Sequence, residues 1–118
     1  MWEVEYTNEF GVWWDNLDGD GQEAIDAAVE KLAQYGPTLP FPISSAIVQS
    51  RHPHMRELRI QYKGRPLRVL YAFNPMRNAI LLLGGDKQGD KRWYDEHVPR
   101  ADVLYDIHLA ELQREGKL

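Results

Sequence analysis

Hydrophobic residues in the first third of the chain pass from strand spacing to helical spacing. Residues 2–6 alternate between apolar and acidic side chains, which predicts a short half-buried strand. In residues 10–17 the apolar side chains fall at i, i+3, i+4 and i+7, and residues 20–35 carry a second helical stripe that a Gly-Pro pair ends. Asp20 stands where it can cap the second helix. The pattern predicts a hairpin of two helices, with the tryptophans of the first helix in the core.

The spacing returns to that of strands from residue 57. Residues 57–62 and 67–73 alternate between the two faces of a strand, and the pair Lys63-Gly64 between them fits a two-residue hairpin turn. Residues 79–83 are apolar at every position, which is typical of a strand buried on both faces. The two glycines that follow are predicted to end this strand. The second half of the chain is therefore predicted to begin with three consecutive antiparallel strands.

Two segments complete the predicted fold. Four prolines keep residues 37–54 extended and irregular, and residues 99–115 place their apolar side chains on one helical face, with Pro99 in the first turn. The order of elements predicts a single α+β domain over residues 1–118. In this domain an antiparallel sheet carries the N-terminal helical hairpin and a C-terminal helix.

The composition indicates a small domain with one core and excludes several kinds of functional site. A chain of 118 residues with 43% hydrophobic residues can bury one core without covalent staples. The absence of cysteine excludes disulfides, cysteine nucleophiles and thiolate metal sites. No basic and apolar leader opens the sequence, and no run of about 18 apolar residues occurs, so we expect a cytoplasmic protein that does not enter membranes.

Charge is strongly segregated along the chain. The formal net charge of −4 taken alone argues against a nucleic-acid ligand. Residues 1–50, however, hold nine acidic side chains against one lysine, whereas residues 51–92 hold ten basic side chains against three acidic ones, and residues 93–118 are acidic again. A basic middle of this kind is the electrostatic pattern that an anionic ligand requires. It is also compatible with a solvated sheet face whose arginines pair with acids elsewhere in the fold.

The predicted hairpin places two arginines opposite one another. If residues 63–64 form the turn, Arg59 faces Arg68 on the same side of the sheet. Like charges in this position destabilise a sheet unless an anion lies nearby. That anion could be a carboxylate of the protein, such as Glu57 or Asp86, or it could be a phosphate, which arginine binds with paired donors.

The strand over residues 79–83 leads toward further polar residues at the same end of the sheet. Lys87 follows it directly, and Lys91, Arg92 and Tyr94 come soon after. Cations stabilise the charge that develops on a phosphorane, and proton donors and acceptors complete a phosphodiester cleavage that uses no metal. The constellation therefore fits cleavage of a phosphodiester, and it is also compatible with an ordinary basic sheet in which Tyr94 belongs to the core.

Several segments carry a family resemblance: ELR at residues 57–59, RVLYAF at residues 68–73, LLLGGDK at residues 81–87, and Tyr94. With the order of elements, they resemble the RelE/HigB toxins of type II toxin–antitoxin systems, in particular the phage-derived Gp49-like branch. The resemblance covers nearly the whole chain. It implies a RelE-like microbial RNase fold and ribosome-dependent, metal-independent cleavage of mRNA, in which the RNA's own 2′-hydroxyl attacks the adjacent phosphate.

The resemblance also implies partners. The expected partners are the ribosome, its mRNA and a cognate antitoxin, which in this branch is usually a helix-turn-helix repressor. Contact with DNA would then be indirect, through the antitoxin. No cofactor and no metal site is expected.

Carried over residue by residue, the resemblance assigns three catalytic roles. Arg68 corresponds to the phosphate-binding arginine, Lys87 to a cation that stabilises the developing charge, and Tyr94 to a tyrosine that stacks on a base or assists proton transfer. RNA contacts are expected from the basic cluster before the hairpin and from cations around the site, namely Arg51, His54, Arg56, Arg59, Lys91 and Arg92. The resemblance supplies no general base.

Three other functions stay open. The same fold could serve as a non-catalytic protein-binding module. The joint presence of the cations and the tyrosine of the predicted site argues against this alternative. His52 and His54 could hold a metal, although Pro53 separates them and no acidic motif lies beside them. Direct binding of duplex DNA would need a basic recognition helix, and the predicted helices are acidic.

Overall fold

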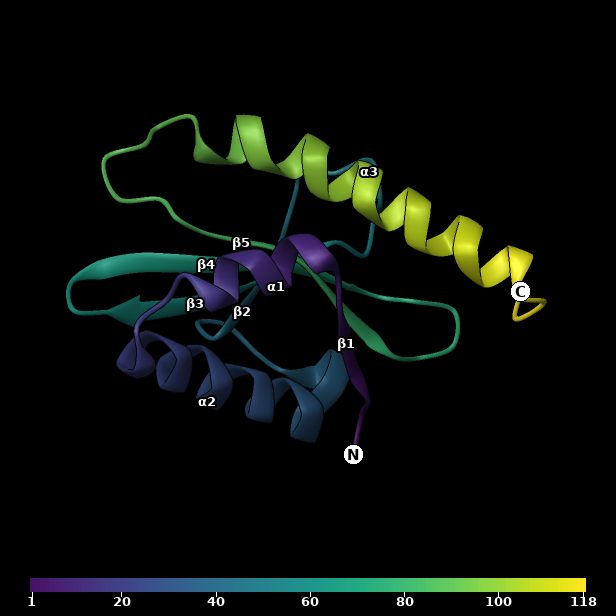
Figure 1. Ribbon diagram of the computed structural model, residues 1–118, viewed down its shortest axis with the longest axis horizontal. Helices are drawn as coiled ribbons and strands as arrows, with labels where there is room; N and C mark the ends of the chain where they lie inside the picture. The colour runs from purple at the N-terminus through teal and green to yellow at the C-terminus, as the bar shows by residue number, and fades with distance from the viewer.

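The computed structural model describes residues 1–118 as a five-stranded sheet with helices on both faces (Figure 1). The elements in chain order are β1 (Val4–Tyr6), α1 (Asn8–Asp15), α2 (Gly19–Tyr35), a short 3₁₀ helix (Gly36–Thr38), β2 (Ser44–Ala46), β3 (Arg56–Tyr62), β4 (Arg65–Phe73), β5 (Ala79–Asp86) and α3 (Trp93–Arg114). The strands lie in the order β1-β5-β4-β3-β2. The predicted α+β class is confirmed, and the sheet is mixed because β1 runs parallel to β5 while all other neighbours are antiparallel.

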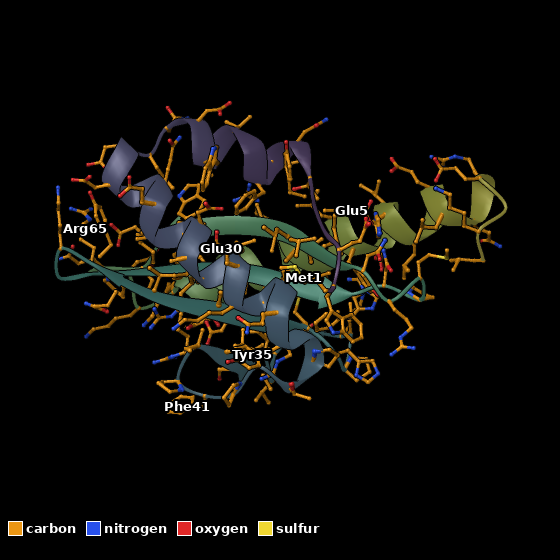
Figure 2. The ribbon with its side chains drawn as sticks, turned by 90° about the horizontal axis from the view of Figure 1, so that it is seen from below. Met1, Glu5, Glu30, Tyr35, Phe41 and Arg65 are labelled. Carbon is orange, nitrogen blue, oxygen red and sulfur yellow. The ribbon has the colours of Figure 1, made fainter.

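The sheet separates two hydrophobic cores. Figure 1 shows α2 on one side of the strands and α3 on the other, and Figure 2, seen from below, shows α2 in front of the sheet. Helix α1 lies on the side of α2, because its Phe10 belongs to the same core as Ile25. Alternate residues of each strand point to opposite faces. Leu58 and Val69 therefore pack with Ile25 of α2 in one core. Leu70 packs with Trp93 of α3 in the other core. Because both faces are covered, a polar side chain on β3 or β4 that faces α3 lies between sheet and helix.

Both N-terminal helices begin at a polar cap. The Thr7 hydroxyl oxygen accepts a hydrogen bond from the Phe10 amide at 3.0 Å, and Asp18 Oδ1 accepts one from the Gly21 amide at 2.7 Å. The prediction of Asp20 as the second cap was wrong. Asp18 also accepts a hydrogen bond from the Tyr62 hydroxyl at 2.7 Å, a contact between distant parts of the chain that local sequence does not reveal.

The sequence predicts that the glycine pair at residues 84–85 ends the strand, but both glycines lie within β5. Their lack of a side chain lets a tryptophan pack on each face of this strand. A Cβ atom on Gly84 would lie 2.1 Å from Trp13 of α1, and one on Gly85 would lie 2.7 Å from Trp93 of α3. The strand continues to Asp86. The close approach of Trp93 fixes the start of α3 over the sheet.

Replacing Gly84 with alanine is expected to lower the free energy of unfolding by about 1–3 kcal/mol, because the new methyl group forces the buried edge of Trp13 to move. Urea unfolding followed by tryptophan fluorescence measures this change. Gly19→Ala is the matched control, since a Cβ there meets nothing within 4 Å. Equal stability of the two variants would contradict the packing described for Trp13.

Two further boundaries differ from the prediction. Residues 37–54 are not wholly irregular, because Ser44–Ala46 forms β2, which pairs with the outer edge of β3. Three residues are too few for an alternation to be recognised in a proline-rich segment. Helix α3 begins at Trp93 rather than near Pro99, which lies inside the helix on its exposed side. No helix has the length and apolar character that crossing a membrane requires.

Candidate anion-binding site

The predicted pair of facing arginines is present between the sheet and α3. Residues 63–64 form the turn, with positive φ angles of 49° and 75°, and the register places Arg59 directly opposite Arg68. Both side chains lie on the face opposite to Leu58 and Val69, since strand residues alternate. Arg68 is 5% exposed, so its charge is held inside the protein.

Glu57 lies between the two arginines. Its carboxylate is 3.5 Å from Arg59 Nη1 and 3.5 Å from Arg68 Nε, and the residue is 4% exposed. Of the two carboxylates that the sequence offered as an internal anion, Glu57 therefore takes this position, and Asp86 instead pairs with the exposed Arg65. Arg68 Nε is buried without a hydrogen-bond partner. One carboxylate thus leaves the pair of guanidinium groups incompletely satisfied.

A hollow opens in front of the arginines. It has a volume of about 270 Å³ and is lined by Pro42, Ile43, Arg59, Gln61 and Arg68. Two arginines and one carboxylate leave a net charge of +1 at its wall. An unpartnered buried donor at a cationic wall favours an anionic ligand, because an anion would supply the missing acceptor.

Tyr94 closes the site from the first turn of α3. Its hydroxyl donates a hydrogen bond to Glu57 Oε1 at 2.7 Å, and the Lys87 ammonium lies 5.7 Å from the centre of its ring. The packing of Trp93 on Gly85 places this turn over the sheet. Burial, and next the hydrogen bond to Glu57, raises the pKa of Tyr94 more than nearby Arg68 lowers it. Tyr94 is therefore a neutral proton donor at physiological pH.

Glu57→Gln is expected to lower the pKa of Tyr94, because the carboxylate that opposes ionisation of the phenol is removed. Titration of the tyrosine Cζ resonances by NMR measures this change. Tyr105 is the internal control, since burial alone raises its pKa. The pKa of Tyr94 in the folded protein is higher than its unfolded value, which is near 10. The contribution of Tyr94 to the free energy of unfolding is therefore present below pH 10, and it is lost as the pH rises through the folded-state pKa. Titration of Tyr94 together with the exposed tyrosines would contradict the contact with Glu57.

The structure brings together four of the predicted site residues and places the others elsewhere. Arg59, Arg68, Lys87 and Tyr94 surround Glu57 or contact a residue that does. Lys91 and Arg92 are exposed in the loop between β5 and α3. Neither residue lines the hollow, and their expected RNA contacts remain predictions.

The basic cluster before β3 is not part of the hollow. Arg51 forms an ion pair with Asp106 in the middle of α3, and exposed His54 lies in a separate hollow beside Arg56. Arg56 donates from Nε to Ser44 Oγ at 2.9 Å. Arg56 is one residue from Glu57 along a strand, so the two side chains point to opposite faces. The expected RNA contacts of these three residues remain predictions about a wider surface.

Two residues of the site, Glu57 and Gln61, were not assigned to it from the sequence. Their spacing from Arg59 is two residues in each direction, so all three share one face of β3. From the sequence, Glu57 is predicted only as a possible internal counter-ion. The period-two spacing was a usable signal, but sequence alone does not tell whether a charged strand face is open or covered.

The histidines have separate partners. His52 Nε2 lies 2.7 Å from Asp106 Oδ1, His97 stacks on Trp93, and His108 lies 3.0 Å from the Asn74 amide. The structure contains no group of three or more histidine or carboxylate side chains arranged to hold a metal ion.

Comparison with known proteins decides the family. Residues 12–106 match the sequence model of the family described as Phage derived protein Gp49-like. The chain belongs to this Gp49-like family. The resemblance predicted from residues 57–94 is thereby confirmed, and the predicted site lies inside the matched segment.

Relatives of this Gp49-like chain include two Mycobacterium tuberculosis proteins that are named as toxins. HigB2 is 41% identical over 103 residues, and HigB3 is 44% identical over 99 residues. The matches cover 86% and 83% of this chain, respectively. This chain spans about half of HigB2, since the match covers 51% of that protein, and it spans 85% of HigB3.

A solved structure of the E. coli toxin RelE, a mutant in the free state, shares the fold. Its TM-score is 0.59 at 12% identity, over 84% of this chain and 96% of that chain. The RelE-like α+β fold predicted for this Gp49-like chain is confirmed.

Proposed function

We propose that this Gp49-like chain is the toxin of a type II toxin–antitoxin system and acts as a ribosome-dependent, metal-independent mRNA endonuclease. Its relatives HigB2 and HigB3 carry toxin names. The observation that carries the proposal is the pair Arg59 and Arg68, which faces an open hollow while sharing the single carboxylate of Glu57. A phosphodiester in this hollow would supply the acceptor that Arg68 Nε lacks.

In the proposed reaction the RNA supplies its own nucleophile. The 2′-oxygen forms a bond to the adjacent phosphorus and the bond from phosphorus to the 5′-oxygen breaks, which gives a 2′,3′-cyclic phosphate and a 5′-hydroxyl end. The phosphorane carries one more negative charge than the phosphodiester from which it forms. Arg59 and Arg68 bind its oxygens, and Lys87 adds a third cation near the leaving group.

Two protons have to move, and Glu57 and Tyr94 are placed to move them. A phosphate between the arginines frees the Glu57 carboxylate to take the proton of the 2′-hydroxyl. Tyr94 holds its proton at physiological pH and gives it to the 5′-oxygen. The hydrogen bond of 2.7 Å between these two side chains then returns the proton from Glu57 to Tyr94 and restores the starting state.

One observation favours a second candidate, a non-catalytic protein-binding module with a RelE-like fold. Glu57 already occupies the position of the anion between the arginines, as it would in a site that only stabilises the fold. Two observations weigh against this candidate: Glu57 lies 3.5 Å from each arginine, and Arg68 Nε has no hydrogen-bond partner. A carboxylate with a purely structural role would be more stable at shorter distances that form full hydrogen bonds with the arginines.

Induction of the protein in translating cells separates the two candidates. We expect growth arrest and new 5′ ends inside translated messages, mapped by primer extension. Growth without arrest and without new RNA ends would refute the endonuclease and favour the binding module. Ends that also form on messages lacking a start codon would contradict dependence on the ribosome.

The antitoxin is expected to present an acidic surface to the basic segment of residues 51–92, whose net charge is +7 from ten basic and three acidic side chains. Attraction between opposite charges speeds association and is screened by salt. Raising the salt concentration from about 0.05 M to about 0.5 M should therefore slow association about tenfold or more in stopped-flow experiments. An association rate that does not depend on salt would place the antitoxin on another surface.

A further inference from the structure

An exposed aromatic ring stands beside the candidate anion site. Phe41 is 69% exposed, in the turn before β2, and lies at the margin of the molecule (Figure 2). Its chain neighbours Pro42 and Ile43 line the hollow in front of the arginines. The Arg59 guanidinium lies over the ring of Phe41, 5.3 Å from its centre. One arginine thus contacts the exposed ring and also forms part of the anion-binding wall.

The turn that carries Phe41 is fixed to the sheet. The Arg59 amide donates a hydrogen bond to the Ile43 carbonyl at 2.8 Å, and the amides of Ile43 and Ser44 donate to the Pro40 carbonyl at 3.1 and 3.0 Å. Prolines on both sides of Phe41 restrict its backbone further. The backbone that carries the ring therefore keeps a defined position relative to Arg59 and the hollow.

We propose that Phe41 is a base-stacking platform for single-stranded RNA whose phosphate lies between Arg59 and Arg68. The subsite rests on the proposed function, since it takes the nucleotide next to the phosphate in the hollow. A flat ring without hydrogen-bonding groups accepts any base face, whereas a wholly structural phenylalanine would be covered. Arg59 links the two subsites, because its guanidinium contacts the ring and can bind the phosphate at the same time.

Phenylalanine labelling tests this subsite directly, because the chain has three phenylalanines. The probe is a short 2′-O-methyl oligoribonucleotide, which has no free 2′-hydroxyl and is not cleaved. We expect the ring resonances of Phe41 to shift on titration, while those of Phe10, which is buried, stay in place. Unchanged Phe41 resonances at millimolar probe would overturn the proposal.

Substitutions provide the matched comparison. Phe41→Ala is expected to weaken binding of the oligoribonucleotide about tenfold or more, and Phe41→Trp to preserve it. Tyr6→Ala is the control, because Tyr6 is an aromatic side chain of similar exposure, 66%, on β1. Equal affinities of wild type and Phe41→Ala would overturn the subsite.

The outcome distinguishes the subsite from the proposed function. If wild type and Phe41→Ala cleave translated mRNA equally, the endonuclease stands and the subsite is refuted. If binding depends on Phe41 but wild type cleaves no message, the subsite stands and the endonuclease is refuted.

Discussion

Replacing Arg68 with alanine is expected to reduce the rate of mRNA cleavage by at least about 100-fold, because one preorganised donor to the phosphorane is lost. Arg68 is 5% exposed and faces Arg59, so no other side chain takes over its position. Cleavage of a ribosome-bound message under single-turnover conditions measures the loss. Arg68→Lys should recover only part of the activity, since an ammonium keeps the charge but not the paired donors.

The same substitution also affects stability, and the two effects can be separated. Removal of Arg68 leaves the buried Glu57 with Arg59 as its remaining cationic contact, which should cost about 3 kcal/mol of the free energy of unfolding. Activity is therefore compared at a temperature where circular dichroism shows each variant folded. Arg65→Ala is the matched control, because Arg65 is on the same strand but exposed and paired with Asp86. Full activity of a folded Arg68→Ala variant would refute the assignment of the site.

The second large effect is expected from Glu57→Gln. As the proton acceptor for the 2′-hydroxyl, Glu57 should contribute about 100- to 10,000-fold to the rate, and glutamine cannot take a proton. The same change removes the carboxylate that competes for Arg59 and Arg68, so an uncleavable 2′-O-methyl oligoribonucleotide should bind more tightly. Slower cleavage together with tighter binding is a combination that misfolding does not produce.

This pair of measurements distinguishes a proton acceptor from a structural counter-ion. If Glu57 only neutralises the arginines, Glu57→Gln will bind RNA more tightly and cleave it at least as fast as wild type. Glu23→Gln, an exposed position on α2, controls for the general loss of one negative charge. Unchanged or faster cleavage by Glu57→Gln would therefore refute Glu57 as the base while leaving the arginine site intact.

The central pair of the site could be predicted because a two-residue turn fixes a register. Once residues 63–64 form the turn, every cross-strand neighbour on β3 and β4 follows, and the structure has Arg59 opposite Arg68 as expected. The basic middle of the chain, hidden by a net charge of −4, coincides with these strands. Local pattern was sufficient here because both residues lie close to the turn.

The features that sequence did not reveal depend on contacts between distant segments. Tyr94 meets Glu57 across 37 positions of the chain, and the packing of α3 on the sheet, including that of Trp93 on Gly85, brings them together. The sequence predicts that the two glycines end a strand, whereas in the structure each lies beneath a tryptophan from a different helix. Glu57 and Phe41 acquire their proposed roles from burial and exposure, which a pattern of residue types does not specify.

The chemistry of the new RNA ends tests the central claim most directly. Messages cleaved by the wild-type protein on purified ribosomes are examined for their termini by ligation and by phosphatase or kinase treatment. Attack by the 2′-hydroxyl without a metal-activated water predicts a 2′,3′-cyclic phosphate and a 5′-hydroxyl, both absent with Arg68→Ala. New ends that carry a 5′-phosphate and a 3′-hydroxyl, or no new ends at all, would contradict the account.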